Sequence, residues 1–187
     1  MGAQRRTLIG LKTKAIIKYM SEIKEVLILT GTCAVGKTST AKAWAKSKNG
    51  AILECDYLTE WIYKEDFPHL TEEEEKFTSN LAVLMAFEYL NKGMSVAIDN
   101  VWSPKAIEAM RSELFRMPNL EVTSVRLICD LKENQKRDQE RVPENQMKER
   151  ITIVNDELNS HVWPSYIKDI DSTNLSVEEV LKIIEEE

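Results

Sequence analysis

The sequence has few cysteines and no long apolar run. Its three cysteines, Cys33, Cys55 and Cys129, lack the spacing of metal ligands, which excludes a cysteine-based metal site. Two of them fall at the ends of predicted buried strands, so we expect free thiols in a reducing compartment. Since no apolar run is long enough to span a membrane, the sequence predicts a cytoplasmic protein.

Basic charge is also scarce. The formal net charge of the 187 residues is −6. A polynucleotide partner requires a basic surface that contacts the phosphate backbone, so this charge disfavours nucleic-acid binding and favours a small-molecule partner. Apolar residues make up 43% of the chain and charged residues 30%, which is usual for a globular domain and excludes a disordered chain.

The basic residues are concentrated at the start of the chain. The first nineteen residues contain five basic side chains and no acidic one. An organelle-targeting peptide, a basic contact with a membrane or partner, and a leader that adds little are the alternatives. Because serine is absent from these residues, we favour the third, with a helix over residues 7–20. Residues 1–22 are thus a basic extension, and residues 23–187 form one domain.

Residues 26–38, VLILTGTCAVGKT, contain the strongest motif of the chain. A buried aliphatic strand leads into a G-x-x-x-x-G-K-[ST] phosphate loop, also called a Walker A motif, and residues 37–46 have the composition of a helix. Glycines allow the backbone N–H groups to converge on a polyphosphate, and the N-terminus of the helix adds to the attraction for anions. Lys37 is expected to reach the β- and γ-phosphates and Thr38 to bind Mg²⁺. The predicted nucleotide contacts are Gly31, Thr32, Cys33, Ala34, Val35, Gly36, Lys37, Thr38 and Ser39.

Strands and helices alternate along the rest of the sequence. The pattern predicts strands near residues 26–29, 51–55, 95–98, 122–129 and 167–170, and helices near residues 37–46, 56–64, 71–91, 103–115, 130–141 and 144–159 and from residue 176 to the end. In the 71–91 helix, the apolar residues Phe77, Leu81, Leu84, Met85 and Tyr89 are expected to share the buried face. The helices that begin near residues 71, 103 and 176 are expected to be capped by Thr71, Ser103 and Ser176. The alternation of strands and helices indicates βαβ units and a parallel sheet covered on both faces.

Two aspartates follow predicted strands and are expected at the carboxyl edge of the sheet, where ligands bind. Asp56 is a candidate to align an acceptor hydroxyl and take its proton, while Asp99 is a candidate to order Mg²⁺ or hold the acceptor. The alternative for each is an N-cap of the helix that follows. Arg137 and Arg141 are four apart on a predicted helix, so we expect one shared face that closes over the transferring phosphate. A solvated face paired with glutamates is the alternative.

These features resemble the P-loop small-molecule kinases, a group that includes gluconate and shikimate kinases, chloramphenicol phosphotransferase, zeta toxins and the kinase domain of polynucleotide kinases. The resemblance covers about residues 25–186 and rests on the phosphate loop, Asp56, Asp99 in A-I-D-N, the K-R-D-Q-E-R-V-P stretch and the closing D-S-T-N-L-S-V-E-E-V. It implies a three-layer α/β/α P-loop NTPase fold, with a five-stranded parallel sheet ordered 2-3-1-4-5 and a small helical lid at about residues 132–145. It also matches Arg137 and Arg141 to paired lid arginines, Asp56 to an acceptor-binding acid, and Thr173 to a position near the adenine.

The acceptor region departs from two members of the group. Residues 57–63, YLTEWIY, contain no basic group of the kind that holds a carboxylate in shikimate-type enzymes or lines the groove of polynucleotide kinases. Their aromatic residues, together with Trp102, suggest aromatic walls in which Trp61 and Trp102 contact the acceptor. Packing in the core or lid is the alternative.

The sequence therefore predicts a cytoplasmic, magnesium-dependent kinase that binds ATP and transfers its γ-phosphate to a hydroxyl of a small-molecule acceptor. A nucleic-acid 5′-end kinase and a non-enzymatic nucleotide-dependent switch are the alternatives. The identity of the acceptor, the preference for ATP or GTP, and the oligomeric state are left open.

Overall fold

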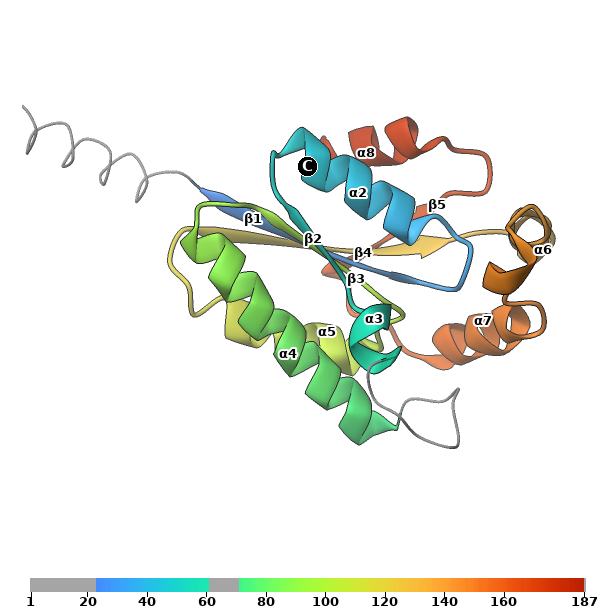
Figure 1. The fold of residues 1–187 in the computed structure, drawn as a ribbon, viewed down its shortest axis with the longest axis horizontal. Helices are drawn as coiled ribbons and strands as arrows, with labels where there is room; N and C mark the ends of the chain where they lie inside the picture. The colour runs from blue at the N-terminus through green and yellow to red at the C-terminus, as the bar shows by residue number, and fades with distance from the viewer. Residues whose placement is uncertain (1–22, 61–70, 187) are drawn as a thin grey trace, which may run out of the picture.

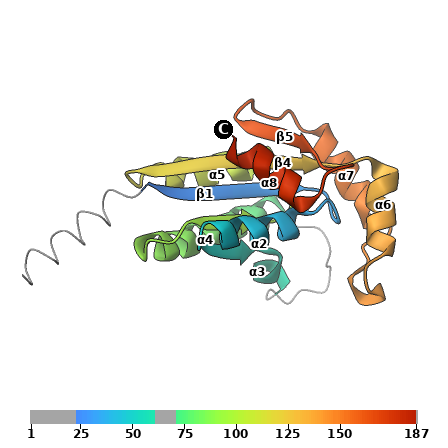
Figure 2. The ribbon, with the colours of Figure 1, turned by 90° about the horizontal axis from the view of Figure 1, so that it is seen from above.

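The computed structural model describes residues 23–60 and 71–186. The basic extension of residues 1–22 and the predicted acceptor contact Trp61 lie outside the described residues. Five strands form one parallel sheet, shown in Figures 1 and 2. They are β1 (Lys24–Gly31), β2 (Ala51–Glu54), β3 (Val96–Asp99), β4 (Leu120–Ile128) and β5 (Ile167–Asp171). Their order, β2-β3-β1-β4-β5, confirms the predicted topology.

The central strand β1 is buried on both faces, as its aliphatic sequence requires. It pairs with β3 on one side and β4 on the other. Successive side chains point to opposite faces, so Val26 and Ile28 enter one core cluster while Leu27 and Leu29 enter the other. The sheet thereby fixes Gly31, the last residue of β1, at its carboxyl edge.

Helices cover both faces of the sheet (Figure 1). On one face lie α2 (Lys37–Ser47) and α8 (Val177–Glu185), and on the other lie α4 (Glu72–Asn91) and α5 (Pro104–Leu114). Beyond the carboxyl ends of the strands lie α6 (Leu131–Gln139), the short 3₁₀ helix η1 (Pro143–Asn145) and α7 (Arg150–Ser160), as Figure 2 shows. The short helix α3 (Asp56–Glu60) follows β2. Within the described residues, no helix has the length and apolar character needed to cross a bilayer.

The capping residues predicted from the sequence are confirmed. Thr71 and Ser176 form capping boxes with Glu74 and Glu179. The hydroxyl of Ser103 accepts a hydrogen bond from the first turn of α5. These side chains satisfy N–H groups that a helix leaves unpaired in its first turn.

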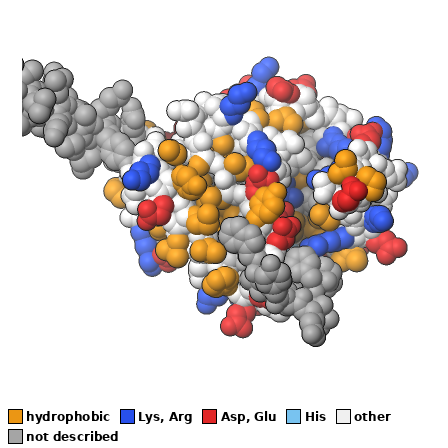
Figure 3. All heavy atoms as spheres, in the orientation of Figure 1, with side chains coloured by type: hydrophobic (Ala, Val, Ile, Leu, Met, Phe, Trp, Pro, Cys, Tyr) orange, Lys and Arg blue, Asp and Glu red, His pale blue; other side chains and the backbone are white. Residues whose placement is uncertain are grey.

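The buried face of α4 differs from the predicted one. Phe77 and Leu84 were expected in the core, but they are 57% and 62% exposed. The buried residues of α4 are mostly small, namely Thr78, Ser79, Ala82, Val83, Ala86 and Leu90. Small side chains let α4 approach α5 and the sheet closely, while Leu81 and Met85, also on the predicted face, pack against the same core. Figure 3 shows hydrophobic side chains on the outer surface of the molecule.

The segment between β4 and β5 also corrects two expectations. The helix predicted to continue through residue 141 ends at Gln139, and the helix predicted for residues 144–159 is divided into η1 and α7. Pro143 disfavours a helical conformation for the residue before it. The side-chain amide of Gln146 donates to the carbonyls of Gln139 and Arg141, which satisfies acceptors at the end of α6.

Candidate functional site

The turn between β1 and α2, which contains the predicted phosphate loop, has three residues with positive φ. Gly31 has φ 140° and Gly36 has φ 103°, and both values lie in the region that favours glycine. Ala34 has a positive φ as well, at 60°. Such a left-handed residue is uncommon without glycine, and it turns the loop back toward the start of α2.

The two glycines are required for different reasons, which gives a testable contrast. A Cβ at position 31 would lie 2.3 Å from the carbonyl oxygen of Leu127, whereas a Cβ at position 36 would meet nothing within 4 Å. We expect Gly36→Ala to lower the free energy of unfolding by about 1–2 kcal/mol, the cost of a left-handed alanine. Gly31→Ala is expected to lower the free energy of unfolding by about 3 kcal/mol or more, because the overlap of its Cβ with the Leu127 carbonyl oxygen adds to the cost of the backbone conformation. Urea denaturation measures both, and equal losses would contradict the assigned role of Gly31.

The N-terminus of α2 has no side-chain cap. Its N-cap residue is Gly36, which has no side chain, whereas α4, α5, α6 and α8 are capped by Thr71, Ser103, Asp130 and Ser176. The N–H groups in the first turn of α2 therefore remain available to a ligand. Together with the helix dipole they form a site suited to an anion.

Lys37 places a cation inside this loop. Its side chain is buried, and its ammonium group donates to the carbonyl oxygen of Thr32, with 2.9 Å between Nζ and O. A buried ammonium group is costly unless it is paired, and a carbonyl dipole pairs it only in part. Phosphate oxygens would supply the missing negative charge.

Thr38 and Asp99 meet at the carboxyl edge of the sheet. The Thr38 hydroxyl donates to Oδ2 of Asp99 at 2.5 Å. Asp99 is only 2% exposed, and its Oδ1 is buried without a hydrogen-bond partner within the described residues. Burial raises the pKa of Asp99, while the charge of Lys37 and the bond from Thr38 oppose that rise. The site therefore holds an acidic group with one buried oxygen that has no hydrogen-bond partner within the described residues.

This pair fits a hydrated Mg²⁺ that is carried by a nucleotide. Mg²⁺ prefers oxygen ligands and keeps several water molecules, so it needs only one or two protein groups. The Thr38 hydroxyl and the unpaired oxygen of Asp99 are such groups. Among residues 23–60 and 71–186, no three His, Cys, Asp or Glu side chains gather into a metal site, so the protein alone offers few ligands there.

Asp56 lies next to Asp99, as the topology predicted. It is the first residue of α3 and is exposed. The N–H of the preceding Cys55 donates to the carbonyl oxygen of Asp99 at 2.9 Å, and the charge of Asp56 contributes to the raised pKa of Asp99. An exposed carboxylate beside the loop is free to accept a hydrogen bond from a ligand. Burial raises the pKa of Cys55, so that thiol is inert.

Arg137 connects α6 to the segment that follows β5. Its Nη2 donates to the carbonyl oxygens of Ser172 and Thr173, at 2.8 and 2.9 Å. The Ser172 hydroxyl lies 3.1 Å from the carbonyl oxygen of Val35 in the phosphate loop. The Thr173 hydroxyl donates to Asp171 and accepts from the N–H of Asp130. Arg137 and Thr173, both predicted nucleotide contacts, are therefore joined to each other and, through Ser172, to the loop.

Two predicted site residues are placed differently. Arg141 follows the end of α6, so it shares no helical face with Arg137, and its guanidinium donates to the carbonyl oxygen of Asn145. The prediction of two arginines on one face was wrong because α6 ends two residues earlier than expected. Trp102 is fully buried in the core cluster that includes Ile107 and Met110, so the packing alternative describes its position.

Three contacts near the site were not predicted from the sequence. Ser172 joins the end of β5 to the loop, and its place after a strand at the carboxyl edge was a usable signal. The Thr32 hydroxyl donates to the carbonyl of Ile151, which attaches the loop to α7. The Asp138 carboxylate accepts from the N–H groups of Met147 and Lys148. Thr32 and Ile151 are 119 residues apart, and Asp138 is nine and ten residues from its two partners, so no local pattern predicts these contacts.

Comparison with known proteins supports the fold. No family model matches the sequence, and no curated protein matches it either. Solved structures do match. A sugar kinase from Janibacter sp. is 15% identical, with a TM-score of 0.64 over 87% of this chain and 92% of that chain. A gluconokinase from Sinorhizobium meliloti is 14% identical, with a TM-score of 0.60 over 86% of this chain and 89% of that chain.

A third solved structure is similar in the same way. The tunicamycin resistance protein of Deinococcus radiodurans is 18% identical, with a TM-score of 0.59 over 86% of this chain and 93% of that chain. At these identities the likeness concerns the fold. The chain has the three-layer α/β/α fold of the P-loop small-molecule kinases, as its sequence predicted.

Proposed function

We propose that this protein is an ATP-dependent phosphotransferase that uses Mg²⁺ and acts on a hydroxyl group of a small molecule. The observation that carries the proposal is the phosphate loop with its buried Lys37, beside the contact between Thr38 and Asp99. An uncapped helix N-terminus, a buried cation and a partnerless buried carboxylate oxygen have a common explanation in a triphosphate with its metal ion.

The residues of the loop bind and orient the nucleotide. Backbone N–H groups at the start of α2 and the ammonium group of Lys37 hold the phosphates, and Thr38 with Asp99 holds the metal ion. When bound, Mg²⁺ neutralises charge on the β- and γ-phosphates. Arg137 holds Ser172 and Thr173, the segment that we assign to the adenine side of the site.

Asp56 is assigned to the acceptor. Phosphoryl transfer has a loose transition state, so an in-line position of the hydroxyl contributes more than early removal of its proton. The exposed carboxylate of Asp56, beside Asp99, accepts the hydrogen bond of that hydroxyl and then its proton. With Trp102 buried, Asp56 is the acceptor contact that the described residues best support.

Other observations support a small acceptor. The similar solved structures include a sugar kinase, a gluconokinase and a tunicamycin resistance protein. The net charge of −6 disfavours a polynucleotide, and the three cysteines are free, in keeping with a reducing cytoplasmic compartment.

The proposal is tested by nucleotide binding followed by an acceptor screen. Calorimetry with a nonhydrolysable ATP analogue and Mg²⁺ is expected to show one site per chain. Pooled sugars, polyols, nucleosides and antibiotics are then tested for stimulation of ADP release, and phosphorylated product is identified by mass spectrometry. Failure of the analogue to bind, or its binding without stimulation by any pool, would contradict the proposed function.

Asp56→Asn tests the acceptor site without changing the nucleotide site. The amide keeps the shape of the side chain but is a poor base and a weaker acceptor, so we expect acceptor-stimulated ADP release to fall by about 100-fold or more. The affinity for the ATP analogue is expected to stay within about twofold. Glu60→Gln, an exposed acid on the same helix, is the matched control. If Asp56→Asn leaves turnover unchanged, Asp56 has no part in the mechanism.

A further inference from the structure

The outer face of α4 carries three apolar side chains, Phe77, Leu81 and Leu84, which we call the α4 stripe. Phe77 and Leu84 are 57% and 62% exposed, and Leu81 between them is half-buried. The three share one side of the helix, because they are spaced four and three residues apart. Figure 3 shows hydrophobic side chains on the side of the molecule where α4 lies. Exposed apolar side chains that are contiguous, unlike single ones, mark a surface where another segment binds.

Acidic side chains flank the α4 stripe. Glu73 lies one turn before Phe77 and Glu88 lies one turn after Leu84, and both are exposed. Neither forms an ion pair with another described residue. The helix has five acidic residues and one basic residue, Lys76. A partner for this surface therefore needs apolar side chains together with positive charge.

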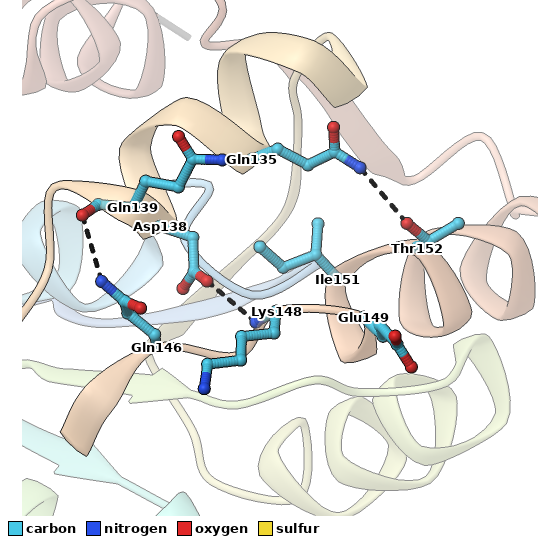
Figure 4. A pocket seen from close by; sticks show the side chains of 8 residues that line it. All are labelled: Gln135, Asp138, Gln139, Gln146, Lys148, Glu149, Ile151 and Thr152. Atoms are coloured by element: carbon cyan, nitrogen blue, oxygen red, sulfur yellow. Dashed lines mark hydrogen bonds between the residues drawn. The ribbon is translucent and has the colours of Figure 1, made fainter. Parts of the chain in front are cut away.

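The cavity between α6 and α7 offers no comparable surface. Its volume is about 320 Å³, and polar groups around it already bind one another, as Figure 4 shows. The Asp138 carboxylate accepts from the N–H of Lys148, and the side-chain amide of Gln146 donates to the carbonyl of Gln139. These bonds join α6 to the start of α7, so the cavity belongs to the packing between the two helices.

The basic extension of residues 1–22 joins the domain beside the α4 stripe. The described chain begins at Ile23, which is exposed, and the N–H of Glu25 donates to the hydroxyl of Ser95. Ser95 comes four residues after Asn91, the last residue of α4. Figures 1 and 2 both show the start of β1 next to the carboxyl-terminal end of α4. The extension is therefore tethered close to the stripe, so its binding there avoids the cost of bringing two molecules together.

The extension has the composition that the α4 stripe requires. Its first nineteen residues contain five basic side chains and no acidic one. In the helix predicted over residues 7–20, four apolar side chains fall at spacings of three and four, which places them on one face. They are Leu8, Leu11, Ala15 and Tyr19. An apolar face of this kind is suited to packing against the apolar side of a neighbouring helix.

The length of the extension fits the length of α4. A helix rises about 1.5 Å per residue, so the 20 residues of α4 span about 30 Å. Arg5 precedes Glu22 by 17 positions, and Glu74 precedes Asn91 by the same number. A segment that runs back along α4 from its carboxyl-terminal end therefore brings Arg5 to the acidic first turn of that helix.

We propose that the extension of residues 1–22 binds along the outer face of α4 in the same molecule. Its apolar side chains cover the α4 stripe, and Arg5 and Arg6 lie beside the acidic residues Glu72–Glu75. The contact removes exposed apolar surface from water and gives the basic charge of the chain an acidic partner. It is independent of the proposed phosphotransferase activity.

Hydrogen–deuterium exchange of the full-length protein tests this contact. In the wild type, we expect the amides of residues 8–20 to exchange about tenfold or more slowly than in a free peptide of the same sequence. Leu84→Lys places a positive charge in the stripe, so that exchange is expected to rise to within about twofold of the peptide. Phe77→Lys is expected to have the same effect. Ile153→Lys, at an exposed isoleucine on α7, is the matched control and is expected to behave like the wild type.

Exchange in β1 reports whether each variant is folded, since this strand is buried. Fast exchange of residues 8–20 in the wild type, or slow exchange that persists in the folded Leu84→Lys and Phe77→Lys variants, would overturn the proposal. Slow exchange that depends on protein concentration, with a dimer in sedimentation, would place the extension on a second copy and would also overturn it. Slow exchange only with vesicles of phosphatidylcholine and phosphatidylserine would instead assign the extension to a membrane surface.

Discussion

Lys37→Ala is expected to weaken binding of the ATP analogue by about 10- to 100-fold and to lower acceptor-stimulated turnover by about 100-fold or more. The ammonium group of Lys37 is buried inside the phosphate loop, where it has the carbonyl of Thr32 as its partner. A charge-assisted hydrogen bond contributes about 1.5–3 kcal/mol, which corresponds to the expected change in affinity. Turnover falls further, because negative charge spreads over the transferring phosphate in the transition state.

Calorimetry and single-turnover measurements check both parts of this result. Lys46→Ala is the matched control, because Lys46 lies on the same helix but is exposed. We expect that variant to behave like the wild type. The unliganded Lys37→Ala protein should remain folded, since the substitution removes a buried charge with an incomplete set of partners. Analogue affinity equal to that of the wild type would overturn the assignment of the loop as the nucleotide site.

Asp99→Asn is expected to lower activity and raise stability at the same time. Asn keeps an oxygen that accepts from Thr38, so the local geometry is retained, but the charge that the metal ion requires is lost. We expect turnover to fall by about 10- to 100-fold. The buried carboxylate, which has one oxygen without a partner within the described residues, disfavours the folded state, so removal of its charge is expected to stabilise the protein. A gain of about 1 kcal/mol would raise Tm by roughly 2–4 °C.

The gain in stability is expected to depend on pH. Because burial raises the pKa of Asp99, the folded protein binds a proton at this position more readily than the unfolded chain does. Below the pKa that Asp99 has in the unfolded chain, the side chain is protonated in both states and does not destabilise the wild type. The destabilisation grows as pH rises and is complete above the pKa that Asp99 has in the folded protein. The advantage of Asp99→Asn is largest at neutral pH and shrinks as pH falls toward about 4.

Thermal unfolding of both proteins over this range measures the effect. Asp156→Asn replaces an exposed aspartate on α7 and serves as the control, with an expected change in Tm close to zero. A lower Tm in Asp99→Asn at neutral pH, or a gain that is constant with pH, would contradict the claim that Asp99 is a destabilising carboxylate kept for function.

The sequence predicted the parts of the fold that depend on local chemistry. The parallel strands and the caps at Thr71, Ser103 and Ser176 were expected and are present, and the residues of the predicted phosphate loop form a turn between β1 and α2. Each is specified by a few adjacent residues, namely glycines at a turn, aliphatic runs in a strand, or a polar residue before a helix. Asp99 was expected at the carboxyl edge of the sheet, and the Thr38 hydroxyl contacts it there.

The features of the fold that depend on side-chain packing could not be predicted from local sequence. The apolar residues of α4 recur at helical spacing on two faces, and the face with Ala82 and Ala86 is buried because α5 and the sheet approach closely. Composition alone favours the larger side chains, so Phe77 and Leu84 were assigned to the wrong side. Trp102 was ambiguous for the same reason, since an aromatic residue suits a pocket and a core equally well.

The end of α6 shows how a tertiary contact overrides a helical pattern. Residues 130–141 have a continuous helical composition, yet the helix ends at Gln139, where the amide of Gln146 binds the free carbonyls and Asp138 holds the next loop. These partners are five to ten residues apart in the chain. The spacing of residues within a helix gives no information about these contacts, so the sequence wrongly predicted that Arg141 shares a helical face with Arg137.

The Ser172 hydroxyl lies 3.1 Å from both the carbonyl of Val35 and the carbonyl of Ile128, so it ties the phosphate loop to the last strand. Ser172 follows Val35 by 137 residues in the chain, so a ribosome releases the loop well before it releases residue 172. The nascent chain thus carries the complete nucleotide motif long before it has the support that shapes it. A truncated protein that stops before β5 would retain every residue of that motif and still lack an organised triphosphate site.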